Sequence, residues 1–192
     1  MKASVIHEYG GPEVLRYEDY PDPVLQPGEV LVRVAAAGVN PVDALERSGQ
    51  TKDWRPVQFP GVLGWDLSGT VERLGAGVED FSIGDQVLAW AYHTYAGLCA
   101  VKAGLLAKVP KGLNLVDAAA LPLVSMTGSQ LIYVGADVKT RANCAGFGCG
   151  RQRGAFGGLC SQGSRRRGHR RGTEEAIRRL EEPWRRSRRR TR

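Results

Sequence analysis

The sequence predicts a mainly β fold, a barrel or sandwich, followed by short helices and then by an arginine-rich segment. Three observations predict this order. Short β-rich runs fill the first hundred residues, and tight turns rather than long helical patterns separate them. The pattern becomes helical after Pro110. From Arg141 to Gly172 the chain is a string of arginine and glycine with no strand pattern.

The β-rich runs supply the expected strands. Turn signals lie between them at Gly10–Pro12, Pro21–Pro23, Gln26–Gly28 and Ile83–Asp85. In the second run Arg33 lies between apolar neighbours, which is typical of a strand with one wetted face. In chain order the runs read "KASVIH", "EVLVRVAAAG", "LSGTVERLG", "DQVLAWA" and "AGLCAVKAGLLAKVP".

Two helices are expected after the strands. Asn114 or Asp117 is predicted to cap a helix that carries Ala118–Leu121. Pro122 marks a break, and a second helix is predicted to run to about Tyr133. We therefore divide the chain into a barrel over residues 1–112, a helical connection over 113–140 and a tail over 141–192.

Charge separates the tail from the rest of the chain. Residues 1–140 hold 11 Lys and Arg against 16 Asp and Glu, a net charge of −5. Residues 141–192 hold 16 Arg against 4 Glu, a net charge of +12, and contain no lysine. The formal charge of +7 for the whole chain is thus the sum of an acidic part and a strongly basic part.

Location follows from what the sequence lacks. Four irregularly spaced cysteines do not predict a disulfide framework, and the first residues lack the long apolar core of a signal peptide. No apolar run approaches the roughly 18 residues that a membrane-spanning helix needs. These observations predict a cytoplasmic protein without a membrane segment.

Four stretches resemble the zinc-independent quinone oxidoreductases of the medium-chain dehydrogenase/reductase superfamily. They are "MKASVIHEYGGPEVLRYEDYPDP", "PGEVLVRVAAAGVNPVD", "FPGVLGWDLSGTVERLGAGVEDFSIGDQV" and "AALPLVSMTGSQLI". The resemblance covers residues 1–140. It implies a GroES-like β-barrel followed by a Rossmann domain, with NADPH bound between them and a quinone, activated carbonyl or alkene as substrate. Homodimers are common in the family.

The resemblance also implies site residues. Asn40 and Asp43 of "GVNPVD" match the catalytic pair, and Asn40 is expected to hydrogen-bond near the nicotinamide or the substrate carbonyl. Trp65 and Asp66 match the substrate pocket, and Thr127 matches a position near the nicotinamide. Each has a structural alternative: Asn40 as a turn cap before Pro41, Trp65 as core, Asp66 as a structural hydrogen-bonding residue and Thr127 as a helical residue bonded to its own backbone.

No metal is expected. Zinc-dependent members carry a cysteine in the first motif and a histidine–glutamate pair in the second, where this chain has Asn40, Trp65 and Asp66. Zinc prefers thiolate and imidazole ligands in a tetrahedral set, and the four cysteines with His169 match no such spacing.

The tail does not continue the family's pattern, in which a strand, a glycine-rich turn and a helix should follow. Reading the codons one base later from Arg141 permits "GQTVLVSGAVGNVGRSAVFAAK", which has that order. At Gln152, His169 and Glu174–Glu175 the shifted codons allow very few residue types. At all three places the allowed residues fit the shifted sequence. We therefore interpret the tail as an out-of-frame, disordered segment, with the Rossmann domain missing or scrambled and the written chain inactive.

The shifted reading also predicts the cofactor. After the second strand, Glu174 and Glu175 become Lys or Arg, which favour the 2′-phosphate of NADPH. Two rival hypotheses remain: a barrel with a basic nucleic-acid-binding tail, and a barrel fragment without activity. The tail has only Phe147, Phe156 and Trp184 for stacking on bases, so no specific nucleic-acid partner is expected.

Overall fold

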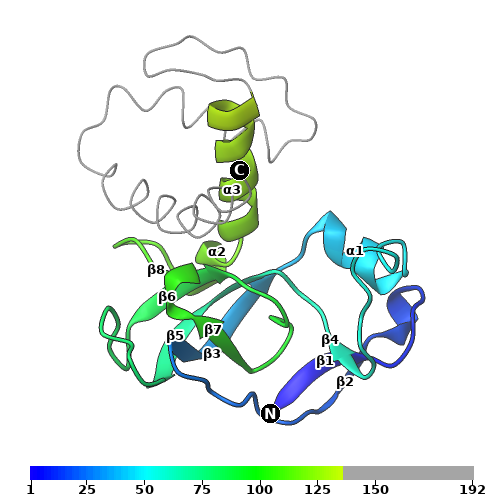
Figure 1. Ribbon diagram of the computed structural model, residues 1–192, viewed down its shortest axis with the longest axis horizontal. Coiled ribbons are helices and arrows are strands. Elements are labelled where there is room, and N and C mark those ends of the chain that lie inside the picture. The colour runs from blue at the N-terminus through cyan, green and yellow to red at the C-terminus, as the bar shows by residue number, and fades with distance from the viewer. Residues whose placement is uncertain (136–192) are drawn as a thin grey trace.

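The computed structural model describes residues 1–135, and these form a mainly β domain, as predicted. Two antiparallel sheets make up the domain (Figure 1). The smaller has the strand order β2-β1-β4, with β1 at Lys2–Ile6, β2 at Arg16–Asp19 and β4 at Gly61–Val62. The larger has the order β7-β3-β5-β6-β8, with β3 at Glu29–Gly38, β5 at Asp66–Leu74, β6 at Gln86–Trp90, β7 at Leu98–Lys102 and β8 at Leu106–Lys108.

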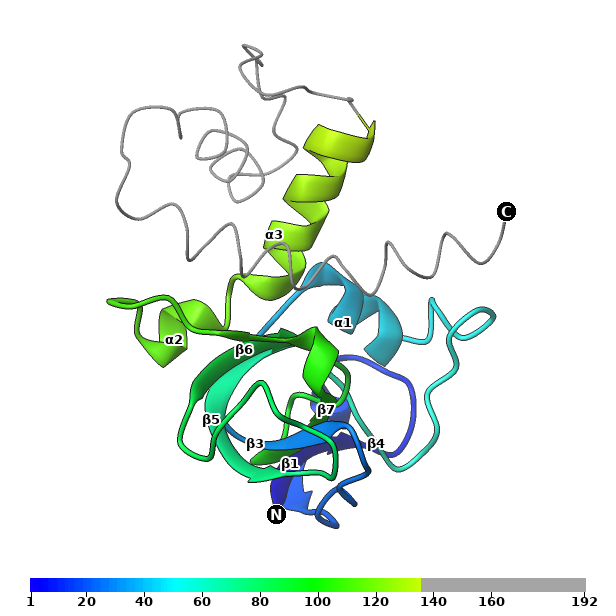
Figure 2. The same ribbon diagram turned by 60° about the vertical axis from the view of Figure 1, so that its left-hand side comes forward.

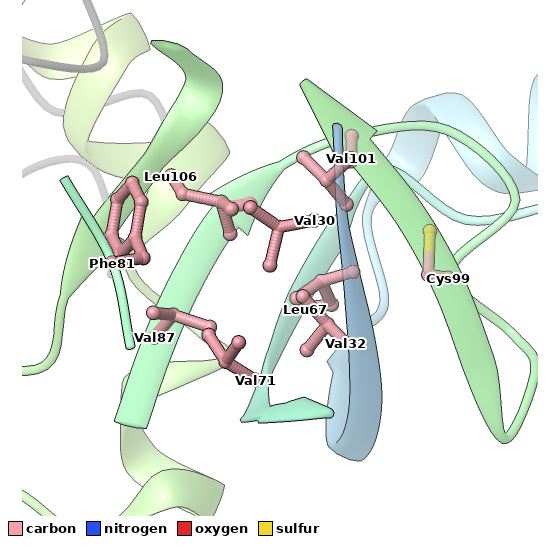
Figure 3. Packing of buried hydrophobic residues seen from close by; sticks show 11 residues of the cluster. Val30, Val32, Leu67, Val71, Phe81, Val87, Cys99, Val101 and Leu106 are labelled. Atoms are coloured by element: carbon pink, nitrogen blue, oxygen red, sulfur yellow. The ribbon is translucent and has the colours of Figure 1, made fainter. Parts of the chain in front are cut away.

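The main core lies against the five-stranded sheet, where alternating side chains of β3 and β5 point inward (Figure 3). Val32 pairs with Val71 across these strands, and both are at most 1% exposed. Arg33 points outward and forms an ion pair with Glu72 at 2.8 Å, which confirms the wetted face predicted for this strand. Burying each large apolar side chain contributes about 1.5–3 kcal/mol. The core therefore fixes the sheet on which the site is built.

The two sheets are joined through β1. An isolated antiparallel bridge pairs Ala3 with Ala96, just before β7. The N–H of Ser4 donates to the carbonyl of Tyr95 at 2.8 Å, and the N–H of Gly97 donates to the carbonyl of Lys2 at 2.9 Å. These bonds hold the segment that carries Tyr95 against the smaller sheet.

Helical segments lie outside the sheets. The α-helices are α1 (Pro41–Arg47), α2 (Leu115–Ala118) and α3 (Pro122–Ser129), and α3 continues as the π-helical turn η3 (Gln130–Gly135). Two short 3₁₀ turns, η1 (Pro12–Val14) and η2 (Ala103–Leu105), complete the described elements. In Figures 1 and 2 α3 rises away from the sheets, so the end of the described chain lies far from β1.

The predicted helices are present with one correction. The side chain of Asn114 accepts the N–H of Asp117 at 2.9 Å, so Asn114 is the cap of α2. The expected extension over Ala118–Leu121 is wrong, because α2 ends at Ala118. There the N–H groups of Ala120 and Leu121 donate to carbonyls three residues back, and Pro122 has no N–H with which to continue the ladder.

Both helices pack on β6 through a second cluster of apolar side chains. Leu88 and Ala107 from the sheet meet Ala118 of α2 and Met126 of α3. The predicted unit boundaries at residues 112 and 140 stay predictions. The tail over 141–192, with its predicted frameshift and disorder, lies outside the described residues.

Candidate active site

Asn40 lies where β3 passes into α1. It is the N-cap residue, and Pro41 is the first residue of the helix, where a missing N–H costs nothing. The backbone N–H of Asn40 donates to Oδ2 of Asp43 at 2.6 Å, and the N–H of Asp43 donates to the carbonyl of Asn40 at 3.1 Å. The predicted catalytic pair is thus in direct contact and buried, and Asn40 occupies the N-cap position before Pro41.

Asp66, the first residue of β5, joins three elements. Its Oδ2 accepts the amide of Asn40 at 2.7 Å, and its Oδ1 accepts the backbone N–H of Leu123 at 2.8 Å. A Cβ on Gly38 would lie 2.9 Å from the Cβ of Asp66 and 2.8 Å from the carbonyl of Ala119. Glycine there lets β3 approach close enough for Asp66 to hold the Asn40 side chain in one orientation.

Burial dominates the electrostatics of these carboxyl groups. It raises the pKa of Asp66 to about 6, although hydrogen bonds from Asn40 and Leu123 oppose the rise. Burial also raises the pKa of Asp43, against hydrogen bonds from Asn40 and Tyr95. The Tyr95 hydroxyl donates to Oδ2 of Asp43 at 2.9 Å, and burial with the nearby carboxylate raises its pKa, so it stays a neutral donor.

Trp65 lies beside Asp66 in a cluster of aromatic rings and charges. Its indole N–H donates to Oε2 of Glu46 at 2.8 Å, and Oε1 of Glu46 forms an ion pair with Nε of Arg55. The Trp65 ring lies 5.0 Å from that of Tyr92 and 5.9 Å from that of Trp90. These contacts give Trp65 a structural role, and its place in a substrate pocket stays a prediction.

Sequence reasoning missed Glu46, Arg55 and Tyr95. Arg55, which contacts Glu46, lies in a loop, and Tyr95, which contacts Asp43, lies far along the chain. No sequence motif therefore predicts either contact. Glu46 had a signal: it lies three residues after Asp43, and in a helix that spacing puts both on one face. The prediction did not use it because residues 41–47 were not predicted to be helical.

Thr127 lies one turn beyond Leu123 in α3 and is partly buried. Within residues 1–135 its side chain makes no hydrogen bond, so the structure does not join it to Asn40. Its role beside a nicotinamide stays a prediction.

Comparisons with known proteins place this arrangement in a family. Residues 26–116 match the alcohol dehydrogenase GroES-like domain. The chain is 36% identical over 141 residues to the chloroplastic NADPH-dependent alkenal/one oxidoreductase of Arabidopsis thaliana, covering 68% of this chain and 36% of that protein. The chain belongs to the medium-chain dehydrogenase/reductase superfamily. It spans well under half the length of this relative.

Solved structures of the superfamily agree. A mycobacterial protein complexed with NADPH is 39% identical, with a TM-score of 0.67 over 72% of this chain and 43% of its own. The quinone oxidoreductase of Escherichia coli complexed with NADPH is 28% identical, with a TM-score of 0.67 over 73% of this chain and 43% of its own. The predicted resemblance to quinone oxidoreductases of the medium-chain dehydrogenase/reductase superfamily is confirmed.

Three further observations concern residues 1–135 of this superfamily member. No group of three His, Cys, Asp or Glu side chains there converges as a metal site would require, and independence from zinc stays a prediction. No helix in the same range is long and apolar enough to cross a bilayer. Cys99 is buried, which raises the pKa of its thiol to about 12 and makes it a poor nucleophile.

Proposed function

We propose that this domain is the substrate-positioning part of an NADPH-dependent oxidoreductase that reduces quinones, activated carbonyl compounds or alkenes without zinc. The observation that carries the proposal is the buried amide of Asn40, which Asp66 holds between β5, α1 and the start of α3. The relatives named as NADPH-dependent or complexed with NADPH support the choice of cofactor.

The described residues fit the nicotinamide end of that cofactor. The carboxamide of nicotinamide is neutral and needs hydrogen-bonding partners, and Asn40 and Thr127 are neutral polar groups. Oδ1 of Asp43 is buried and has no partner within residues 1–135, so the site keeps an acceptor position close to Asn40. Residues for the phosphates are not among these, and the predicted cationic positions Glu174 and Glu175 of the shifted reading lie outside the described residues.

The chain's own residues would then work by placement. NADPH supplies a hydride when it is bound. Asn40 orients the carbonyl of the acceptor, because Asp66 fixes the direction of its amide. Trp65, which directly precedes Asp66, and Tyr92 would offer aromatic surface to the acceptor. Correct placement of two reactants supplies a large share of the barrier reduction in such reactions.

The proposal has three parts beyond the reaction. The written chain is expected to show little or no turnover, because the frameshift predicted near codon 141 removes the phosphate-binding turn. A cytoplasmic location and a homodimer of the intact protein are also part of the proposal. The named relatives include a chloroplastic protein, so location needs its own measurement.

Resequencing the gene around codon 141 is the first test, followed by assays of the written and frame-restored proteins with a quinone acceptor. We expect NADPH oxidation only by the restored protein, with a higher kcat/KM for NADPH than for NADH. Asn40→Ala should lower its kcat/KM about tenfold or more, equivalent to at least about 1.4 kcal/mol of transition-state binding. Arg33→Ala, on the outward face of β3, is the matched control and should leave it unchanged.

Several results would contradict the proposal. A confirmed gene sequence with no alternative frame would remove the frameshift. Equal or better kcat/KM with NADH would remove the cofactor assignment. Micromolar binding of NADPH by the written chain that resists added salt would show a formed nucleotide site where only weak ionic association is expected.

A further inference from the structure

Arg55 is held between two aromatic rings beside the candidate site. Its Cζ lies 3.7 Å from the ring centroid of Tyr92 and 4.4 Å from that of Trp65. The two rings are nearly perpendicular, with an interplanar angle of 84°, so the guanidinium occupies the corner between them. The backbone N–H of Arg55 donates to the carbonyl of Thr51 at 2.7 Å, which closes the loop that carries it.

Glu46 fixes the direction of this guanidinium. Glu46 is 3% exposed, and its carboxylate forms an ion pair with Nε of Arg55 through one oxygen and accepts the Trp65 indole N–H through the other. A bound carboxylate cancels most of the charge of the cation. The pair therefore presents an oriented hydrogen-bond donor with little net charge.

The outer end of Arg55 remains available. Nη1 and Nη2 have no hydrogen-bond partner within residues 1–135, and the side chain is 28% exposed. A guanidinium has five N–H donors in a rigid fork, four of them on Nη1 and Nη2. Trp65, whose ring packs on the guanidinium, directly precedes Asp66 in the sequence, and Asp66 in turn binds Asn40.

We propose that Arg55 binds the carbonyl oxygen of a flat, conjugated acceptor through Nη1 and Nη2. This inference rests on the proposed function and names its substrate class. A carbonyl oxygen suits the site better than a phosphate, because Glu46 already neutralises the cation. A planar ring suits it better than an aliphatic chain, because the edges and faces of Trp65 and Tyr92 favour aromatic stacking.

The test measures binding without NADPH, by equilibrium dialysis of the full chain with duroquinone and with durene, its hydrocarbon analogue. Arg55→Met should weaken the binding of duroquinone about tenfold or more, as expected for loss of a hydrogen bond from a charged donor. It should leave the binding of durene unchanged. Arg33→Met, which removes an exposed cation on β3, is the matched control and should change neither.

A second variant separates binding from folding. Arg55→Met leaves Glu46 buried without its cation, so the Tm should fall. Arg55→Met combined with Glu46→Gln keeps an acceptor for the Trp65 indole and should recover the Tm, but not the affinity for duroquinone. If Arg55 has a purely structural role, the double variant should recover both the Tm and the affinity for duroquinone. That result would overturn the inference.

Failure of this inference differs from failure of the proposed function. Equal affinities of the wild type and Arg55→Met for duroquinone, or wild-type binding of duroquinone no tighter than of durene, would overturn the inference even if the frame-restored enzyme reduces quinones. Loss of duroquinone binding in both Arg55 variants would support it even if no form of the protein oxidises NADPH.

Discussion

The buried carboxyl group of Asp66, which accepts two hydrogen bonds, makes the stability of the folded protein depend on pH. Its pKa is raised to about 6 from the ordinary 3.8, because burial disfavours the charged form. A raised pKa in the folded state means that the native protein binds this proton more tightly than the unfolded chain does. The resulting stability is fully present below the ordinary pKa and is lost as pH rises through about 6. The difference between the raised and the ordinary pKa corresponds to about 3 kcal/mol of unfolding free energy.

The variant Asp66→Asn removes this titration and keeps a side chain of the same shape. Between pH 4 and pH 7 the unfolding free energy of the wild type should fall relative to that of the variant, by up to about 3 kcal/mol. Urea denaturation at several pH values measures both curves, and the other titrating groups cancel in the difference. Parallel curves would show that the pKa of Asp66 is not raised in the folded protein.

At the scale of elements, Asn114 decides where α2 begins. Its side chain accepts the N–H of Asp117 at 2.9 Å and also donates to the carboxylate of Asp117 at 2.7 Å. Asn114→Ala should lower the unfolding free energy by about 1 kcal/mol, the usual effect of losing an N-cap. Asn114→Ser, which keeps a capping oxygen, should lose much less. Thermal denaturation compares them, and equal losses would indicate that the cap is not what stabilises this turn.

The long strands were predictable from the sequence, whereas the shortest elements were not. The predicted run "EVLVRVAAAG" coincides with β3, because alternating β-branched and apolar residues bounded by turns identify a half-buried strand. The two-residue strand β4 and the strand β2, "RYED", have too few apolar residues for such a pattern. Helix α1 begins at Pro41, and the pair Asn40-Pro41 also begins turns, so only tertiary contacts distinguish a helix from a turn here.

At the scale of the whole molecule, stability depends on the core of the five-stranded sheet. Leu67 of β5 is fully buried in the main cluster, whereas Ile83 is 69% exposed in a turn. Leu67→Ala should cost about 2–5 kcal/mol through lost burial and an unfilled cavity. Ile83→Ala removes a similar volume and should stay within about 0.5 kcal/mol. Urea midpoints test the pair, and similar losses would mean that the two positions share one environment.

The sequence named residues of the candidate site, whose roles stay predictions, but it did not reveal how they are connected. Asn40, Asp43, Trp65 and Asp66 were identified through a resemblance, and the structure shows that hydrogen bonds link Asn40 to both aspartates. The ion pair of Glu46 with Arg55 depends on a loop whose path no periodicity encodes. Contacts between separate loops are decided by packing, which a single sequence does not display.

The hydrogen bond from Leu123 to Asp66 has a practical consequence for building chimaeric enzymes. A hybrid that joins this barrel to the second half of a relative needs a junction in the chain, and the loop before Pro122 looks convenient. A junction there would make the first turn of α3 and its carboxylate partner come from different parents. Placing the junction after Leu123 instead keeps both ends of that bond from one parent, so the orientation of Asn40 is inherited together with the barrel.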